Sequence, residues 1–169
     1  LGIPAPDVNL GAAGGTLAAV AGSIMLAYES LLAETPADCC IVVGDVTSTM
    51  ACAISAKRAG LALAHVEAGI RSHDMSMPEE VNRLVTDAVA DWFFTTSRWA
   101  GDNLRAAGVG DERIFFVGNT MIDTLLRHRS RFTMPEGEPF GGLTASGYLV
   151  LTLHRPSNVD DSERLRQLI

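Results

Sequence analysis

Short apolar runs alternate with longer amphipathic stretches through the middle of the chain. Each apolar run closes on a glycine, an acidic residue or threonines, and the stretch after it carries helical start and stop signals. Such lengths and boundaries are typical of buried strands and of amphipathic helices, respectively. The pattern predicts strands at 38–44, 61–67, 91–96 and 113–118, and helices at 47–60, 77–90, 97–107 and 119–132.

Strands that alternate with helices at this spacing are typical of βαβ units, in which right-handed crossovers join parallel strands. The strand segments are apolar at consecutive positions, not only at alternate ones. We therefore expect an α/β fold with a Rossmann-like parallel sheet that is covered by helices on both faces.

The alternation stops after residue 132. Residues 133–147, TMPEGEPFGGLTASG, are rich in Pro and Gly without a period, which predicts a linker. A new apolar run at 148–153, YLVLTL, predicts another strand. We expect residues 1–132 to form one α/β domain, and 148–169 to begin a second, truncated one. Both chain ends suggest a fragment of a longer protein.

Residues 10–28 carry no charge, over a length that is sufficient to span a bilayer. Much of this stretch is Gly, Ala, Ser and Thr, which add little transfer free energy. Acidic Glu29 and Glu34 follow directly, without a Lys or Arg flank to set an orientation. The sequence therefore favours a buried amphipathic helix, and no membrane association is expected.

Composition narrows the class of protein further. Hydrophobic residues make up 47% of the 169, enough for a sizeable core, and the net charge of −7 argues against a nucleic-acid surface. Cys39 and Cys40 are adjacent and Cys52 stands alone, which is no disulfide framework. With no signal-peptide pattern, a reducing cytoplasm is expected.

Polar residues gather where the predicted strands end. In doubly wound sheets, ligands bind outside the carboxyl ends of the strands, so this shared placement predicts a site. The residues concerned are Asp45, Glu67, Thr95, Thr96, Gly118, Asn119, Thr120, His154 and Arg155.

Two of these carboxylates have competing interpretations. Asp45 is either the N-cap of the next helix or part of a hydroxyl-rich turn with Thr47–Thr49 that holds a sugar or phosphate. Glu67 ends an apolar strand and has little room to reach solvent. It is either an ion-pair partner of Arg71 or His65, or a general acid or base in a cleft.

Charged pairs mark two further positions. Glu79 and Glu80 open a predicted helix, where acidic residues favour the helix dipole. Neighbours on a helix point about 100° apart, so only one of the two is expected to face a cleft. His154 and Arg155 are a cationic pair that either forms an exposed loop or binds a phosphate or pyrophosphate.

Metal and thiol chemistry are not expected. The spacing of His65, Glu67, His73 and Asp74 matches no standard zinc pattern. The cysteines fall inside a predicted strand and a predicted helix, so no catalytic cysteine is foreseen. No cofactor is expected either.

Six segments carry a resemblance to a known family: PDVNLG (6–11), VVGDVTSTMA (42–51), HVEAGIRS (65–72), MPEEVNRLVTD (77–87), RIFFVGNTMIDTLL (113–126) and LTLHRPSNVDD (151–161). Taken together, they resemble the non-hydrolysing UDP-N-acetylglucosamine 2-epimerase family. The resemblance runs in the family's order over nearly the whole chain, and HVEAG followed by PEEVNR is its most specific part. The resemblance implies that residues 1–132 hold most of the family's first Rossmann-like domain, without its first strand, and that 148–169 are the truncated start of the second, after a linker at 133–147.

The resemblance implies two Rossmann-like domains in a GT-B-like arrangement, with a UDP-sugar in the cleft between them and a homodimer at full length. It implies reversible epimerisation at C2 of the sugar by elimination and re-addition of UDP. Asp45, Glu67 and Glu79 match the family's carboxylates, and His154 matches its diphosphate-contacting histidine, with Arg155 beside it. Which carboxylate removes the proton is left open.

Departures from the family pattern leave the substrate open. Val46 and Ser48 stand where threonine is common, and Ser157 where glutamate is frequent. A related UDP-2-acetamido sugar, including a uronic acid, is therefore a second candidate substrate. Two further functions stay open: hydrolysis of the UDP-sugar, as in a hydrolysing relative, and binding of a nucleotide sugar without turnover.

Overall fold

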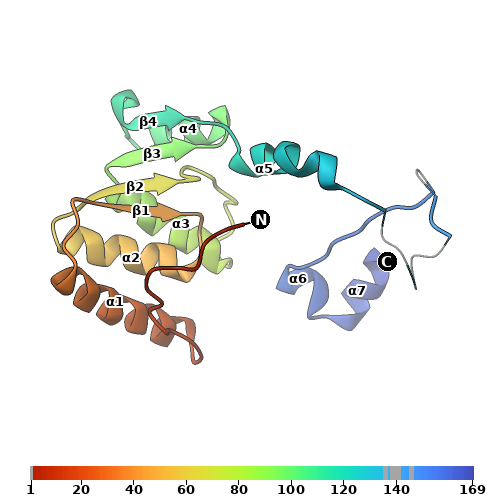
Figure 1. The fold of residues 1–169 in the computed structure, drawn as a ribbon, viewed down its shortest axis with the longest axis horizontal. Helices are drawn as coiled ribbons and strands as arrows, with labels where there is room; N and C mark the ends of the chain where they lie inside the picture. Colours follow the sequence, from red (N-terminus) through yellow and green to blue (C-terminus); the bar gives the residue numbers. More distant parts are fainter. Residues whose placement is uncertain (1, 135–136, 138–141, 145–146) are drawn as a thin grey trace. The chain divides into compact units, whose positions relative to one another are not determined.

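The computed structural model describes residues 2–134, 137, 142–144 and 147–169 (Figure 1). The chain divides into two compact units, Leu1–Arg127 and His128–Ile169, and each unit is described by itself.

The first unit is built on a four-stranded parallel sheet in the order β1-β2-β3-β4. All four strands predicted for this part of the sequence are confirmed, each shorter than its apolar run. They are β1 (Cys39–Val43), β2 (Ala62–Val66), β3 (Trp92–Thr95) and β4 (Ile114–Phe116).

Helices follow the strands as the alternation predicts. Ser97 caps the helix after β3, because its hydroxyl accepts a hydrogen bond from the Ala100 amide at 3.1 Å. The last helix stops at His128 and is followed by a 3₁₀ turn, so it is shorter than the predicted 119–132. The elements are α2 (Thr47–Arg58), α3 (Pro78–Val89), α4 (Arg98–Ala106) and α5 (Thr120–His128), with 3₁₀ turns η1 (Asp111–Arg113) and η2 (Arg129–Arg131).

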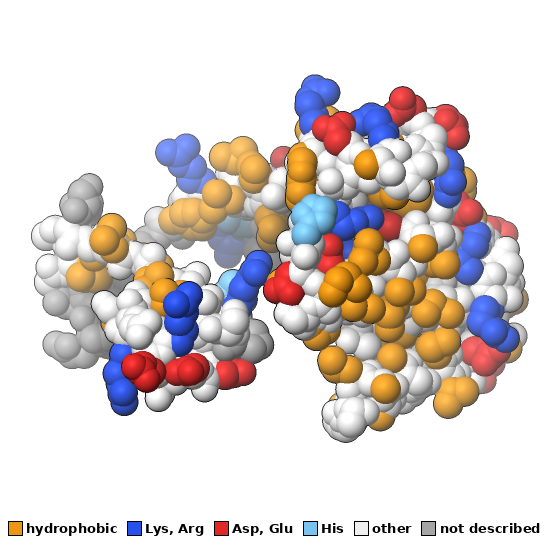
Figure 2. Space-filling view, turned by 180° about the vertical axis from the view of Figure 1, so that it is seen from behind, with side chains coloured by type: hydrophobic (Ala, Val, Ile, Leu, Met, Phe, Trp, Pro, Cys, Tyr) orange, Lys and Arg blue, Asp and Glu red, His pale blue; other side chains and the backbone are white. Residues whose placement is uncertain are grey.

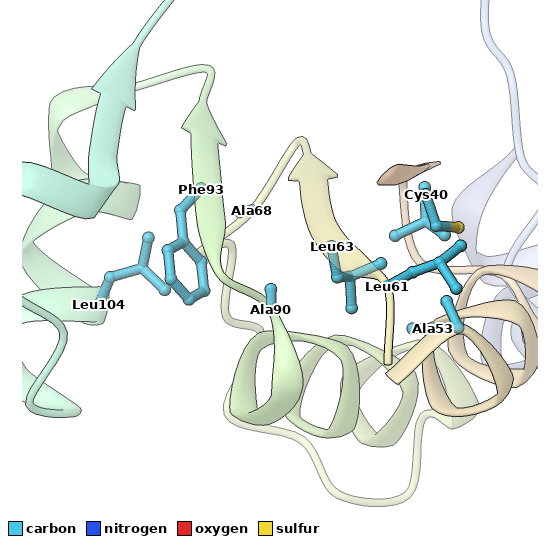
Figure 3. Packing of buried hydrophobic residues seen from close by; sticks show 10 residues of the cluster. Cys40, Ala53, Leu61, Leu63, Ala68, Ala90, Phe93 and Leu104 are labelled. Carbon is cyan, nitrogen blue, oxygen red and sulfur yellow. The ribbon is translucent and has the colours of Figure 1, made fainter. Parts of the chain in front are cut away.

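The hydrophobic core lies on one face of the sheet. Phe93 of β3 packs in one cluster with Leu63 of β2 and Leu104 of α4 (Figure 3). Cys40 of β1 and Ala53 of α2 belong to the same cluster. The helices that follow the first three strands therefore cover the same side of the sheet.

The opposite face of the sheet is largely uncovered, so the prediction of helices on both faces is wrong for the described residues. In β1, Ile41 and Val43 are 67% and 60% exposed, and the strand alternates between exposed and buried positions. Register pairs place Trp92 and Phe115, both partly exposed, on the same face as these residues. Right-handed crossovers that all advance in one direction along a sheet put every helix on one side, which explains this asymmetry.

A long apolar helix, α1 (Leu17–Glu34), precedes the sheet. It begins later than the predicted 10–28 because Thr16 caps it, its hydroxyl accepting from the Ala19 amide at 3.2 Å. It packs against α2, and Tyr28 and Leu32 contact the core, but Ile24 is its one buried residue. The helix is apolar around its whole circumference and largely exposed, so the prediction of a buried amphipathic helix is wrong. By length and composition alone it is also sufficient to cross a membrane, a test that core helices of soluble proteins pass as well.

The second unit contains two short helices, α6 (Pro156–Val159) and α7 (Ser162–Leu168). Asp161 caps α7 by accepting from the amides of Glu163 and Arg164. The strand predicted at 148–153 is irregular backbone, because no described strand lies beside it and a lone strand leaves its backbone groups unpaired. The described part of 133–147 has no helix or strand, as expected for a linker, and the rest of it lies outside the described residues.

Candidate active site

Two turns meet at the carboxyl ends of β1 and β2. The Gly44 amide, after β1, donates to the carbonyl of Val66 at 3.0 Å, which ties the first turn to the second. Gly44 has φ of 73°, and a Cβ at this position would lie 3.4 Å from Oε2 of Glu67. A glycine is therefore needed here for its left-handed backbone, while a Cβ would make only an ordinary van der Waals contact with the Glu67 carboxylate.

Asp45 is held by α3 and does not cap α2. The N-cap of α2 is Val46, which makes no side-chain capping bond, so the N-cap interpretation of Asp45 is wrong. Its carboxylate instead forms an ion pair with Arg83, and its carbonyl accepts from the Asn82 side chain at 2.8 Å. With its side chain 30% exposed, Asp45 is anchored and still reachable by a ligand.

Glu67 has a strained backbone. Its φ is 72°, in the left-handed region that side chains rarely adopt, at a cost of about 1–3 kcal/mol. The amides of Glu67 and Ala68 both donate to the carbonyl of Phe94, at 2.9 and 3.2 Å, which holds this turn in place. Within the described residues its carboxylate has no hydrogen-bond or ion-pair partner. Strain of this kind concentrates at functional sites, which supports the acid–base interpretation.

The ion-pair interpretation of Glu67 is wrong, because both proposed partners bind Asp87 on α3. Asp87 accepts from His65 Nδ1 at 2.7 Å and from the Gly69 amide at 3.1 Å, and it forms an ion pair with Arg71 Nη1 at 2.6 Å. Asp87 is buried and His65 is fully buried. Glu67 itself is only partly buried, so the expected shortage of room at its side chain holds in part.

Glu80 is the buried member of the acidic pair that opens α3. Burial on its own raises the pKa of this carboxyl, but four hydrogen bonds outweigh burial and lower the pKa to about 2. The donors are the amide and hydroxyl of Ser72, the amide of His73 and Nη1 of Arg83. Glu80 therefore fastens the turn after Glu67. Glu79 is partly exposed and has no partner among the described residues, so it is the one of the pair that is available to a ligand.

Arg83 and Asp87 belong to the site although they are not among the predicted site residues. A signal for them exists, because Glu80, Arg83 and Asp87 are spaced i, i+3 and i+7, which places them on one helical face. That face is turned inward, while Val81 and Leu84 of the same helix are exposed. A helix with a polar stripe inside and apolar residues outside departs from the usual pattern and indicates an internal polar site.

The other predicted site residues make fewer contacts than Asp45 and Glu80. Gly118 has φ of 82°, and the Asn119 side chain accepts from the Met121 amide at 2.9 Å, as in a simple turn before a helix. His154 and Arg155 lie in the second unit just before α6, and both are exposed. Their approach to Asp45 and Glu67 stays a prediction, because each unit is described by itself.

Metal and thiol chemistry find no support in the described residues. None of them form a group of three or more His, Cys, Asp or Glu side chains placed to hold a metal ion. The three cysteines are free, as expected. Burial, and to a lesser extent the neighbouring Cys40, raises the pKa of Cys52 to about 11, and burial also raises the pKa of Cys40. Both thiols are therefore protonated near neutral pH and poor nucleophiles.

Similarity to known proteins extends over the whole chain. A family model for UDP-N-acetylglucosamine 2-epimerase matches residues 1–169. A UDP-2,3-diacetamido-2,3-dideoxy-D-glucuronate 2-epimerase from Pseudomonas aeruginosa is 38% identical over 171 residues, covering all of this chain and 47% of that protein. A UDP-N-acetylglucosamine 2-epimerase from Methanocaldococcus jannaschii is 36% identical over 172 residues, with the same coverage.

Solved structures agree with these relatives. The crystal structure of the Methanocaldococcus jannaschii enzyme in complex with UDP-GlcNAc and UDP matches with a TM-score of 0.83 and 36% identity, over 98% of this chain and 46% of that chain. The predicted α/β, GT-B-like class with a Rossmann-like parallel sheet is thereby confirmed. The chain spans about half the length of the relatives that it matches. On the match of its entire length, the chain belongs to the UDP-N-acetylglucosamine 2-epimerase family.

Proposed function

We propose that the complete protein interconverts UDP-N-acetylglucosamine and UDP-N-acetylmannosamine by reversible epimerisation at C2, as a supply of precursors for cell-surface polysaccharide. The observation that carries this proposal is Glu67, whose carboxylate sits on a strained backbone beside the anchored Asp45 and has no partner among the described residues. Family membership supplies the reaction class. Backbone strain also occurs at ligand clamps, so family membership, and not the strain, is what argues against a binding module without turnover.

The chemistry explains why several carboxylates gather at one edge of the sheet. The C2–H bond of the sugar is not next to a carbonyl, so its direct deprotonation is very difficult. Elimination avoids this: a base takes the C2 proton while the C1–O bond breaks, its electron pair leaves with UDP, and a 2-acetamidoglucal results. Protonation at C2 on the opposite face and re-addition of UDP at C1 complete the epimerisation.

This sequence of steps needs a base and an acid on opposite faces of the ring, and a cation for the departing diphosphate. We assign the acid–base roles to Asp45, Glu67 and Glu79 together, without distributing them. We assign the diphosphate contact to His154 and Arg155. Positioned acid–base groups typically contribute about 10²–10⁴-fold each.

A related UDP-2-acetamido sugar is the second candidate substrate. The observation that favours it is the 38% identity to a 2-epimerase named for UDP-2,3-diacetamido-2,3-dideoxy-D-glucuronate. Val46 and Ser48, which replace the commoner threonines beside Asp45, lie where the substrate is recognised in this proposal. Assaying both UDP-sugars side by side distinguishes the two candidates.

We further propose a cytoplasmic homodimer for the complete protein. In the first unit, apolar side chains gather on the face that Figure 2 shows. Val81 and Leu84 of α3 are among the exposed apolar residues of this unit. An outward apolar helix face of this kind is typical of a subunit interface. The net charge of −7 remains an argument against nucleic acid as a partner.

The proposed function is tested in heavy water. The complete protein is incubated with UDP-N-acetylglucosamine in D₂O, and the products are analysed by NMR and mass spectrometry. Epimerisation gives UDP-N-acetylmannosamine with deuterium at C2, and C2 exchange in the substrate. Free N-acetylmannosamine with UDP indicates a hydrolysing enzyme, and binding without any C2 exchange would contradict the proposal.

A further inference from the structure

The side chain of His65 lies between the turn that leads into Asp45 and helix α3. It is fully buried in β2, and both ring nitrogens face oxygen atoms. Nδ1 lies 2.7 Å from a carboxylate oxygen of Asp87, and Nε2 lies 2.9 Å from the carbonyl oxygen of Gly44. A backbone carbonyl only accepts hydrogen bonds, so Nε2 carries a hydrogen and donates it to Gly44.

The bond to Gly44 completes the fixation of the backbone of this residue. The amide of Gly44 already donates to Val66, so both polar groups of this residue are tied to β2. The carbonyl of Gly44 belongs to the same peptide plane as the amide of Asp45. The orientation of that plane sets the direction in which the chain enters Asp45.

The other side of the imidazole is fixed by α3. Asp87 holds Nδ1 and is itself held by Arg71 and by the Gly69 amide. The two ends of one ring thus bind the peptide after β1 and the helix α3. His65 therefore joins the turn after β1 to α3, while Glu67 lies two residues further along its own chain.

We propose that His65 is a positioning residue, which sets the separation of the Asp45 and Glu67 carboxylates through its Nε2–H bond to the Gly44 carbonyl. It touches neither substrate nor reacting atoms. The inference rests on the proposed function, because its effect is on a reaction that needs both carboxylates. Misplacement of reacting groups by about 1 Å typically costs on the order of 10²-fold in rate.

Two variants that each keep one of the two hydrogen-bond donors test this role in the complete enzyme. The amide nitrogen of glutamine occupies roughly the place of histidine Nε2, and that of asparagine roughly the place of Nδ1. His65→Gln thus keeps a donor for Gly44, and His65→Asn keeps a donor for Asp87. Each variant loses one buried hydrogen bond, so their unfolding midpoints are expected to fall by similar amounts.

If His65 positions the site, kcat falls on the order of 10²-fold in His65→Asn and much less in His65→Gln, while KM changes little in either. Labelling glycine at C1 and aspartate with ¹⁵N selects the Gly–Asp pairs, which in these 169 residues are Gly44–Asp45, Gly101–Asp102 and Gly110–Asp111. The signal that disappears in Asp45→Asn belongs to the Gly44 carbonyl. Its ¹³C shift should stay near wild type in His65→Gln and move in His65→Asn. Equal kcat values in the two variants, or losses of kcat that simply follow their stability, would overturn the proposal. Absence of epimerisation in the wild type would instead refute the proposed function, and the carbonyl shift would still report on the bond to Gly44.

Discussion

The backbone at Glu67 is strained, and the position of its carboxylate depends on that strain. A non-glycine residue with φ of 72° is stable only where its surroundings impose the conformation. Here two amides converge on the Phe94 carbonyl and impose it. The sequence predicts a functional carboxylate at this position from its place after an apolar strand, but the strain is visible only in the structure.

The first prediction tests the chemical role of Glu67. In the complete enzyme, Glu67→Gln keeps the size of the side chain and removes its charge, so turnover should fall on the order of 10²-fold or more. Folding and UDP affinity should stay near wild type. Glu34→Gln, on an exposed glutamate at the end of α1, is the control. A Glu67→Gln enzyme with near wild-type turnover would refute the assignment.

The second prediction tests the strain itself. Glycine tolerates positive φ, so Glu67→Gly should be more stable than Glu67→Ala by about 1 kcal/mol in chemical denaturation. The neighbouring Ala68 has no positive φ and is fully buried. Ala68→Gly should therefore lower the stability, by about 1 kcal/mol. If Gly and Ala proved equally stable at position 67, the left-handed conformation would be in doubt.

The third prediction concerns Glu80 and acid. Its pKa lies at about 2 in the folded protein and at 4.5 ordinarily, so the carboxylate stabilises the fold above about pH 4.5. That contribution, on the order of 3 kcal/mol, is lost as the pH falls from about 4.5 towards 2. Glu80→Gln should thus be less stable than wild type at pH 7, and the difference should shrink in this acid range.

Urea unfolding between about pH 7 and about pH 3 measures this difference. Glu79→Gln is the control, because it leaves the four hydrogen bonds of Glu80 in place. Its free energy of unfolding should therefore fall as steeply on acidification as that of the wild type. A wild type and a Glu80→Gln variant that lose stability in parallel on acidification would show that Glu80 is not the group responsible.

At the scale of elements, α3 is the helix that organises the site. Its buried residues are polar, namely Glu80, Asn82, Thr86 and Asp87. Through them it contacts the turns after β1 and β2, so one rigid helix places both candidate catalytic turns. Local signals located the start of this helix correctly, but its polar interior depends on which face packs inward, which tertiary packing decides.

The fourth prediction tests this buried network. Asp87→Ala removes the acceptor of His65 and of Arg71, whose side chain is 8% exposed, and leaves a buried charge without its carboxylate partner. The free energy of unfolding should fall by about 3–5 kcal/mol. Asp87→Asn keeps the shape and one acceptor oxygen, and should be less damaging.

Asp102→Ala is the matched control for the Asp87 variants. Asp102 also pairs with an arginine, Arg105, but both side chains are largely exposed, so its removal should leave the unfolding midpoint unchanged. Similar effects of Asp87→Ala and Asp102→Ala would contradict the view that α3 is held by a buried network.

At the scale of the whole molecule, some features can be predicted from the local sequence and others depend on tertiary packing. The strands and helices of the first unit follow from periodicity and caps, so their order and approximate bounds are predictable from the sequence. Which faces of the sheet the helices cover cannot be predicted from the sequence, because the apolar run of β1 does not reveal that Ile41 and Val43 face away from the helices. The run at 148–153 shows the same limit: a strand needs a partner strand, and none is described beside it.

The last prediction follows from that open sheet face. Expressed alone, the 169-residue chain should show no epimerase activity, because relatives that carry the activity are about twice as long. It should also aggregate, since Ile41 and Val43 lie exposed on a strand at the edge of the described sheet.

Ile41→Lys places a charge on this face and should raise the monodisperse fraction in size-exclusion chromatography, with an unchanged circular dichroism spectrum. Glu34→Gln, which leaves the face as it is, should aggregate like the parent chain. A parent chain that is already monodisperse and active would show that the open face is not a liability and that these residues suffice for catalysis.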